Sequence, residues 1–541
     1  MIDDRPAATR PRGALRPWLQ GVLVFLIAFV PRVLTAVEGF VHQDERRWLV
    51  RSERYARAML SLDFSNATSS VEGHHTMPGV TTTAVGGVAR VLWGGLRDLG
   101  VASFAGDDFD QARSALIISQ VLMAAATSAL LVLLWWVLSK WSTRIVATTA
   151  VVILATEPIL VADGTKLKTD SFLMLFGAIG AFALAAALEV PAKRDRHLGR
   201  RTRWLLAVVA GVGLGGAIAS KLTALTFGPF FLGLVAYAGI RAWRTRARPR
   251  DVVVVTGLAV LVAVAFVAIL WPAAWADPSG QLEVLRGTSR LQSSGHVQYF
   301  LGEVTSDPGP LFYFLVVPIR MTPWLFLASI PSLVVSLRVR ALRGFALVAL
   351  AYAAVPFVTI LLSETKFDRY SFPIWPVFAV LVGLLVQSIA TWCRAHGARR
   401  QRTFEVAAVG AITGLVVYTM LVVPFGYVYA NPVLGAGPVA DEVMQLGVDS
   451  ATEAGDFIRD RDGGRCVDRR IRTRFPSRLW FPCGDMTRGA VELVPGDYVV
   501  VFANRAKTIP KEDLANVRAE GQRVATIRAR GVDIAEIIQV R

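Results

Sequence analysis

The chain has little charge and few cysteines for its length. Of its 541 residues, 18% are charged and 54% are hydrophobic, whereas soluble domains carry about 25% charged residues. Three cysteines are too few for a disulfide-rich scaffold or a four-ligand zinc site. What the chain has instead is a series of apolar runs, repeated between Trp18 and Phe425. Runs of this length predict a polytopic α-helical membrane protein.

Eleven apolar segments are expected to cross the membrane as helices. They run near 18–36, 112–139, 145–161, 170–190, 204–220, 222–240, 252–271, 312–337, 344–362, 371–392 and 403–425. The first segment lacks a small-residue cleavage site, so we interpret it as a retained helix and not as a signal peptide. The pattern predicts a transmembrane domain over residues 1–425 and a separate C-terminal domain over residues 426–541.

The basic residues between the spans predict the orientation of the chain. With the N-terminus in the cytoplasm, the inner segments hold 24 Lys and Arg against four acids, as the positive-inside rule requires. Two long outer loops, 37–111 and 272–311, and the C-terminal domain then face outward across the cell (plasma or inner) membrane. The formal charge of +17 thus reflects membrane topology, and no nucleic-acid partner is expected.

The C-terminal residues have the pattern of a small α/β domain. Cys466 and Cys483 both belong to it, and outside the cell they could form a disulfide; the alternative is two unpaired thiols. Alternation and length predict helices at 451–460 and 511–519. They predict strands at 497–502, 523–528 and 533–540.

Two adjacent acids, Asp44 and Glu45, directly follow the first span. Ionisable residues at a membrane boundary are costly and are often functional. One of them could serve as a general base while the other orients the acceptor or pairs with a cation. The alternative is a pair of solvated helix-capping acids, because Arg46, Arg47 and Arg51 follow at amphipathic spacing.

Lysine is rare, since only eight of the 58 basic residues are Lys. Nevertheless, four lysines and two arginines are expected at outer helix ends: Lys166, Lys168, Lys221, Lys366, Arg320 and Arg369. Compact cations beside apolar helices suit a phosphate whose attached chain lies in lipid. The alternative is that these long side chains simply reach to the membrane interface.

Other motifs carry less information. Asp108-Phe109-Asp110 could hold a divalent ion, but such triplets are common in loops. The outer loops contain no paired-His metal signature, no nucleophile elbow and no phosphate-cradling glycine loop, so neither a metal nor a cofactor is required. The glycines between Gly211 and Gly216 lie inside an apolar span and indicate close helix packing.

Five stretches, in order along the chain, resemble one family. They are Asp44-Glu45, the run Met77–Thr83, the segment Gly295–Leu311, the run Lys366–Tyr370 and the run Asn431–Gly435. Together they resemble the GT-C superfamily of membrane glycosyltransferases, and specifically the bacterial relatives of the protein O-mannosyltransferases (glycosyltransferase family 39). The resemblance implies the GT-C fold. The sequence departs from the family at Met77, where relatives often have His before Pro-Gly; His74 and His75 nearby are possible substitutes.

The resemblance implies that a hexosyl or pentosyl group moves from a polyprenyl-phosphate-linked donor to an acceptor hydroxyl on the outer face, with inversion. The acceptor could be a protein, a lipid glycan or a cell-wall polysaccharide. In this interpretation Asp44 is the base, and Glu45 orients the acceptor or pairs with a cation. The residues expected to bind the donor phosphate are Lys366, Arg369, Lys221 and Arg320, and those expected to bind substrate are His74, His75, His296, Asp368 and Tyr370.

Two other functions remain open from the sequence. A transporter or lipid-linked-sugar flippase would need charged or broken helices in the membrane, and Glu157-Pro158 is a candidate break. A non-catalytic scaffold for envelope assembly would tolerate the loss of Asp44 and of the lysines.

Overall fold

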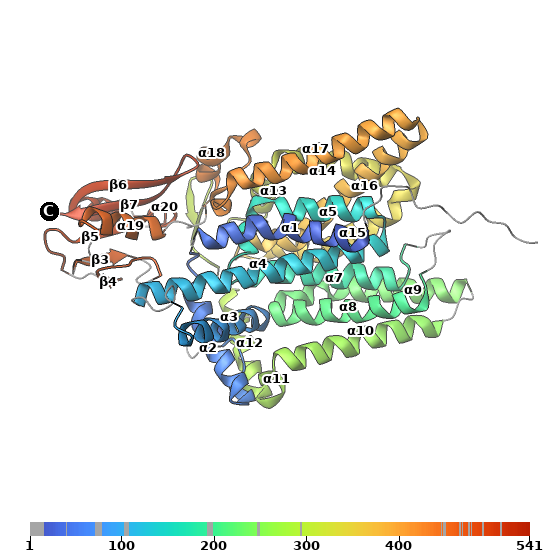
Figure 1. The fold of residues 1–541 in the computed structure, drawn as a ribbon, viewed down its shortest axis with the longest axis horizontal. Coiled ribbons are helices and arrows are strands. Elements are labelled where there is room, and N and C mark those ends of the chain that lie inside the picture. The colour runs from blue at the N-terminus through green and yellow to red at the C-terminus, as the bar shows by residue number, and fades with distance from the viewer. Residues whose placement is uncertain are drawn as a thin grey trace, which may run out of the picture.

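In the computed structural model of the chain, a long helical bundle carries a small sheet domain at one end (Figure 1). The structure describes residues 16–38, 41–70, 78–101, 108–191, 198–245, 249–292, 295–444, 446, 451–464, 467, 469–473, 477, 479–488, 492–508 and 511–541.

Nine helical segments in the described part of the chain are long and apolar enough to cross a membrane. Short 3-10 helices, η3 (Leu222–Phe227) and η4 (Asp368–Ile374), lead into two of them. The nine agree with nine of the eleven predicted spans. The helices are α1 (Pro17–Val37), α4 (Asp108–Trp141), α7 (Asp170–Ala187), α8 (Arg200–Ser220), α9 (Gly228–Arg244), α10 (Pro249–Leu270), α15 (Arg340–Leu362), α16 (Trp375–Ala395) and α17 (Ala398–Val422).

The other two predicted spans are helical but broken. The span near 145–161 is divided into α5 (Arg144–Thr156) and α6 (Pro158–Asp163), and the span near 312–337 into α13 (Leu311–Arg320) and α14 (Pro323–Arg338). Each break falls at a proline, which lacks the N–H needed to continue the helix but suits the first position of a new one.

The two breaks contact each other through Glu157. Its buried carboxylate accepts hydrogen bonds from the backbone N–H of Thr322, at 3.0 Å, and from the Thr322 hydroxyl. Because Thr322 caps the start of α14, the acid that interrupts one span satisfies the polar groups of the other. This membrane acid therefore has a structural partner.

Helix α7 is the centre of the bundle, and every residue in it is buried. Glycines allow α8 to pack tightly against it, since a Cβ at Gly213 would lie 2.3 Å from the backbone nitrogen of Gly180. Such close approach is typical of small residues in membrane helices. The central position of α7 holds its first residue, Asp170, at the end of the bundle where the charged side chains gather.

The two long outer loops contain short elements of their own. The first contains α2 (Glu45–Leu60), η1 (Phe64–Asn66) and α3 (Val80–Asp98). The second contains α11 (Ala273–Ala276), α12 (Pro278–Gln292) and an antiparallel hairpin of β1 (Gln298–Phe300) and β2 (Glu303–Thr305).

The C-terminal domain is a five-stranded mixed sheet with the order β4-β3-β5-β7-β6 (Figure 1). Helices α19 and α21 and strands β5, β6 and β7 lie where the sequence predicts them; β3 and β4 were not anticipated because they are only four and three residues long. The elements are α18 (Ala436–Val443), α19 (Ala451–Arg461), β3 (Arg470–Thr473), β4 (Asp485–Thr487), β5 (Tyr498–Phe502), α20 (Ala503–Ala506), α21 (Lys511–Ala519), β6 (Gly521–Ala529) and β7 (Val532–Val540).

The cysteines differ in state. Cys483 is buried and disulfide-bonded, and Cys393 is a free buried thiol at the end of α16. Cys466, the predicted partner of Cys483, lies outside the described residues, so this pairing stays a prediction.

Two contacts join the C-terminal domain to the second outer loop. Lys507 forms an ion pair of 2.7 Å with Asp441 of α18 and lies 4.6 Å from the ring centre of Tyr299 in β1. The backbone N–H of Leu301 donates to the carbonyl of Val443, at 3.0 Å. The β1–β2 hairpin thus contacts both Lys507 and the end of α18.

Candidate active site

Charged side chains from five distant segments gather at the end of the bundle that faces the C-terminal domain. They come from the start of α2, the turn between α6 and α7, the end of α8, the end of α13 and the η4 turn before α16. Most are buried, which is costly unless each charge is paired or hydrogen-bonded. Their partners therefore indicate which groups have a structural role and which remain available to a substrate.

Asp44 is the N-cap residue of α2, and its side chain is one-third exposed. Its backbone N–H donates to Nδ1 of His42, at 3.1 Å, and its carboxylate lies 3.6 Å from the same nitrogen. In the described structure no side chain donates a hydrogen bond to this carboxylate. The backbone of Asp44 is therefore fixed by a hydrogen bond, while its carboxylate remains accessible to a substrate.

His42 is buried and faces three cations. Burial, together with the charges of Lys168, Arg369 and Lys166, lowers its pKa well below the usual value of 6.5. A neutral imidazole agrees with the hydrogen bond that Nδ1 accepts from the Asp44 amide, and this bond leaves the ring proton on Nε2. His42 thus holds the Asp44 backbone without adding a charge beside the carboxylate.

Glu45, the neighbour of Asp44, is fully buried. Its carboxylate accepts hydrogen bonds from the amide N–H of His42 at 2.7 Å, from Nε2 of Gln120 at 2.9 Å and from the amide N–H of Leu167 at 3.1 Å. These bonds join the start of α2 to α4 and to the lysine-bearing turn between α6 and α7. Glu45 positions these segments, and its oxygens are occupied.

Lys168 belongs to a closed buried network. Its Nζ lies 3.0 Å from Asp163 and 3.1 Å from the hydroxyl of Tyr427, which itself donates to Asp163 at 2.8 Å. The second oxygen of Asp163 accepts from Ser171, at 2.7 Å. The neighbouring Lys166 is also fully buried and acts on His42 through its charge. This turn therefore supplies a positive potential beside Asp44.

Asp170, at the start of α7, is shared by two cations. Lys221 lies 2.7 Å from one of its oxygens and Arg369 lies 3.5 Å from the other. The ring of Tyr370 lies under Lys221, at 4.1 Å, and the ring of Phe367 lies under Arg369, at 4.3 Å. Two cations on one carboxylate leave a surplus positive charge, which suits an incoming anion.

Arg320 is more fully engaged than the other cations. It forms a double contact with Asp368, at 2.9 and 2.7 Å, and donates to the carbonyls of Tyr427 and Tyr429. It therefore connects α13 to the η4 turn and to the chain leading into the C-terminal domain. The Asp368 carboxylate is bound by Arg320 in turn. This ion pair therefore stabilises the segments that carry the site.

Lys366 is buried, but its carboxylate partner is half-exposed. Its Nζ lies 3.0 Å from Asp307, which follows the β1–β2 hairpin. The hydrogen bond from the Gly309 amide and the charge of Lys366 lower the pKa of Asp307. His296 at the start of the hairpin is exposed, and its ring lies 5.2 Å from that of Phe367. The second outer loop thus covers this side of the cluster.

Some predicted residues fall elsewhere. His74, His75 and Met77 lie outside the described residues, as do the side chains of Asp108 and Phe109. No group of three or more His, Cys, Asp and Glu side chains that could hold a metal occurs in the part of the chain that the structure describes.

Sequence reasoning missed four members of the cluster. Asp163 and Asp170 flank the two lysines in the same turn, so pairing by nearest charge could have found them. His42 stands two residues before Asp44, but its role needed the hydrogen bond to be seen. Tyr427 follows the last span, and the sequence around it does not predict a place in the site. Its partners Asp163 and Lys168 are more than 250 residues away.

Chemically, the cluster combines the partly exposed carboxylate of Asp44 with buried cations at the end of an apolar helical bundle. A carboxylate so placed can take a proton from a hydroxyl. Cations in a partly dry environment can hold a phosphate and stabilise charge that develops on it. The arrangement therefore suits a reaction in which a hydroxyl displaces a phosphate.

The chain resembles known proteins in both sequence and fold. A family model, dolichyl-phosphate-mannose-protein mannosyltransferase (PMT), matches residues 113–277, the part that contains Lys166, Lys168 and Lys221. No curated protein matches the chain in sequence.

Solved structures extend the likeness over nearly the whole chain. ArnT from Cupriavidus metallidurans, bound to undecaprenyl phosphate, is 14% identical with a TM-score of 0.52, and the match covers 97% of this chain and 98% of that one. The oligosaccharyltransferase AglB from Archaeoglobus fulgidus, in complex with an inhibitory peptide and a dolichol-phosphate, is 10% identical with a TM-score of 0.50, covering 96% and 74%.

These matches confirm two of the predictions. The chain has the GT-C fold as a multi-pass membrane protein, and the expected resemblance to this superfamily of glycosyltransferases holds. The transporter alternative has no support among the comparisons.

Proposed function

We propose that this chain, a membrane protein of the GT-C fold, is a glycosyltransferase that moves a single hexosyl or pentosyl group from a polyprenyl-phosphate donor to an acceptor hydroxyl. One observation carries the proposal: the partly exposed carboxylate of Asp44 lies beside a cluster of mostly buried cations at one end of the bundle. In ArnT and AglB, the two structures of this fold described above, polyprenyl phosphates are bound, which supports a lipid-linked donor.

The reaction would proceed in one displacement at the anomeric carbon. Asp44 takes the proton of the acceptor hydroxyl while the hydroxyl oxygen forms a bond to the anomeric carbon. The bond from this carbon to the phosphate oxygen breaks, and the polyprenyl phosphate leaves with the electron pair. Attack from the face opposite the leaving group inverts the configuration. General base catalysis of this kind typically contributes 10²–10⁴-fold.

The cations would act on the leaving phosphate. Arg369 and Lys221 share Asp170 and so keep part of their charge for a further anion. Lys366 is held by the half-exposed Asp307, which a phosphate could displace. Arg320 would contribute less directly, because Asp368 and two carbonyls occupy it. Phosphate charge grows in the transition state, so these groups would stabilise it more than the bound donor.

Residues near the acceptor side would contact sugar. Tyr370 presents a ring beside Lys221 and His296 lies exposed by the hairpin; His74 and His75 remain candidates on the first loop. Asp368 would act mainly through Arg320. The acceptor is proposed only as a hydroxyl of a protein, a lipid glycan or a cell-wall polysaccharide.

We place the cluster on the outer face of the cell membrane, with the N-terminus in the cytoplasm. The excess of Lys and Arg between the spans supports this orientation. Residues 426–541 would then form an extracytoplasmic domain above the site, and residues 1–425 the transmembrane domain.

The proposal can be tested by comparing envelope glycans and secreted glycoproteins of a deletion strain with those of the parent by mass spectrometry. A missing sugar, restored by the wild-type gene and not by the Asp44→Asn variant, is the expected result. Loss of the same sugar with the lipid-linked sugar accumulating on the inner leaflet would support a flippase instead, and unchanged glycans would contradict the proposal.

A further inference from the structure

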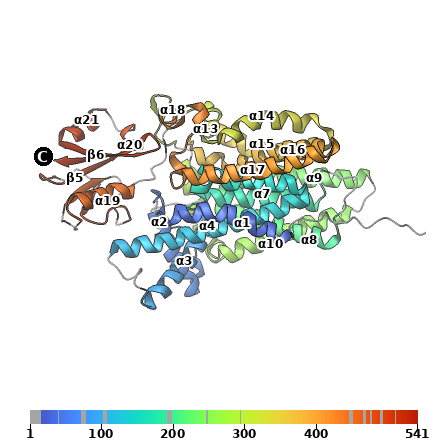
Figure 2. The same ribbon diagram turned by 45° about the horizontal axis from the view of Figure 1, so that its top comes forward.

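The glycines of α8 set how closely it approaches two neighbours. Gly213 and Gly216 face α7, whereas Gly211 and Gly215 face α10: a Cβ at Gly211 would lie 2.5 Å from the Ala259 carbonyl oxygen. At mid-membrane the two helices α8 and α10 therefore touch almost backbone to backbone, and they run side by side in both views (Figures 1 and 2).

The same pair of helices encloses a groove at the opposite end from Asp44. There the small residues give way to Arg200, Arg203 and Trp204 on α8. The groove has a volume of about 620 Å³ and is lined by Arg200, Arg203, Trp204, Arg250, Asp251, Val254 and Val255.

The charges of this groove are only partly neutralised. Arg203 donates to the carbonyl of Ala187, at 3.2 Å, and lies 3.5 Å from Asp251. Arg200 and Arg250 are exposed, and in the described structure neither has a carboxylate partner. Arg200 lies 5.7 Å from the ring centre of Trp204. Two unneutralised guanidinium groups thus face an opening that a phosphate group would fit.

The floor of the groove is apolar. Trp204 is 41% exposed and Val254 is 36% exposed. From them α10 continues as the most apolar of the nine described spans, and most of its residues are not buried inside the protein. A soluble phosphate would gain nothing from such a surface, whereas a lipid would place its acyl chains on it.

We propose that the groove between α8 and α10 binds the headgroup of one anionic phospholipid. Its phosphate would lie between Arg200 and Arg250, its glycerol region against Trp204, and its acyl chains along α10. Under the proposed orientation this lipid belongs to the cytoplasmic leaflet, where anionic headgroups attract basic residues. The site is independent of the proposed sugar transfer and depends only on the membrane position of the helices.

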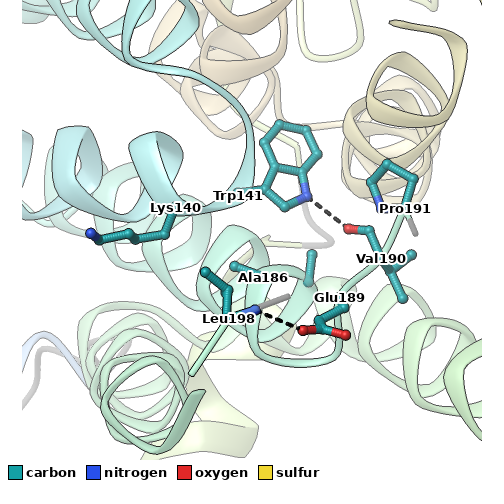
Figure 3. A pocket seen from close by; sticks show the side chains of 8 residues that line it. Lys140, Trp141, Ala186, Glu189, Val190, Pro191 and Leu198 are labelled. Carbon is teal, nitrogen blue, oxygen red and sulfur yellow. Dashed lines mark hydrogen bonds between the residues drawn. The ribbon is translucent and has the colours of Figure 1, made fainter. Parts of the chain in front are cut away.

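A second cavity at the end of the bundle opposite Asp44 is too small to bind a lipid headgroup. It is lined by Lys140, Trp141, Glu189, Val190 and Leu198 among others (Figure 3). Its volume of about 20 Å³ accommodates a single water. The Trp141 indole and the Leu198 amide already donate to Val190 and Glu189 across it.

Native mass spectrometry of the full chain in detergent tests the site. The protein is mixed with equal amounts of phosphatidylglycerol and phosphatidylethanolamine of the same acyl chains. The wild type should retain one phosphatidylglycerol molecule in preference to phosphatidylethanolamine. The double variant Arg200→Gln/Arg250→Gln should lose this preference by roughly tenfold or more, since each basic residue contributes about 1 kcal/mol near an anionic headgroup.

Two control variants and one competing ligand test whether the binding depends on this groove. Arg399→Gln/Arg402→Gln removes two exposed arginines at the start of α17, and it should keep the preference. Val254→Trp should abolish binding by filling the groove while its charges remain. Millimolar inorganic phosphate should not displace the lipid. Equal retention of both lipids by the wild type, equal loss in both arginine variants, or displacement by inorganic phosphate would overturn the proposal.

Discussion

Glu45 and Gln120 are joined by hydrogen bonds of 2.9 and 3.0 Å between the Gln120 amide and the two carboxylate oxygens. The bonds lie in a fully buried position, and they separate the roles of two acids that stand side by side in the sequence. Glu45 is held on every side by donors, whereas the carboxylate of Asp44 stays partly exposed. The adjacent acids therefore differ in environment, and the proposed chemistry depends on that difference.

Glu45→Gln is expected to reduce stability more than it changes the chemistry. The new amide would direct its NH₂ group at N–H donors of Gln120, His42 or Leu167, leaving a buried donor without an acceptor at a cost of about 1–3 kcal/mol. The apparent melting temperature of the detergent-solubilised protein should fall by several degrees. A variant with unchanged stability and lost transfer would instead give Glu45 a direct part in the reaction.

His42 variants can test the hydrogen bond that holds Asp44. The oxygen of Asn can take the place of Nδ1 and accept the Asp44 amide, whereas the longer Gln places its polar group near the position of Nε2. His42→Asn should therefore keep most of the transfer rate, and His42→Gln and His42→Ala should lower kcat with little change in donor KM. Equal loss in all three variants, at equal folded protein, would argue against this positioning.

The neutral state of His42 predicts a pH dependence of stability. The folded protein resists protonating a ring surrounded by Lys166, Lys168 and Arg369, while the unfolded chain takes up a proton below about pH 6.5. Because the unfolded state then binds more protons, stability decreases as the pH falls through this value. The melting temperature should drop more steeply from pH 7.5 to 5 in the wild type than in His42→Asn. Identical slopes would contradict the assignment.

Lys366 and Asp307 should have opposite effects on donor binding. Lys366→Gln removes a cation proposed to hold the phosphate, so the donor KM should rise. Asp307→Asn removes only the carboxylate that pairs with this lysine, so the donor KM should stay the same or fall. Titration of the donor in membranes that contain each variant measures both. A higher KM in Asp307→Asn would show that this acid helps to bind the donor.

The sequence predicted the helices well because their cause is local. Apolar runs, prolines and loop charges all act within a few residues, so the spans, the break at Pro158 and most of the C-terminal elements could be anticipated. The break at Pro323 falls inside a span that was predicted as continuous. The scarcity of lysine also directed attention to Lys166, Lys168, Lys221 and Lys366, which all lie in or beside the cluster.

The division of roles within the cluster could not be predicted, because it depends on distant partners. Glu45 differs from Asp44 through Gln120, which is 75 residues away, and Arg320 is engaged through carbonyls more than 100 residues along the chain. Such contacts exist only after the helices have packed. Short strands such as β4 were missed for a related reason, since three residues carry no readable alternation.

The central claim is that Asp44 is the base for sugar transfer. The most direct test is the transfer of labelled sugar from a saturating polyprenyl-phosphate donor by Asp44→Asn, measured in proteoliposomes that contain equal amounts of folded protein and together with donor binding. We predict that the donor still binds and that the transfer rate falls by about 10²–10⁴-fold. A rate close to that of the wild type would contradict the account.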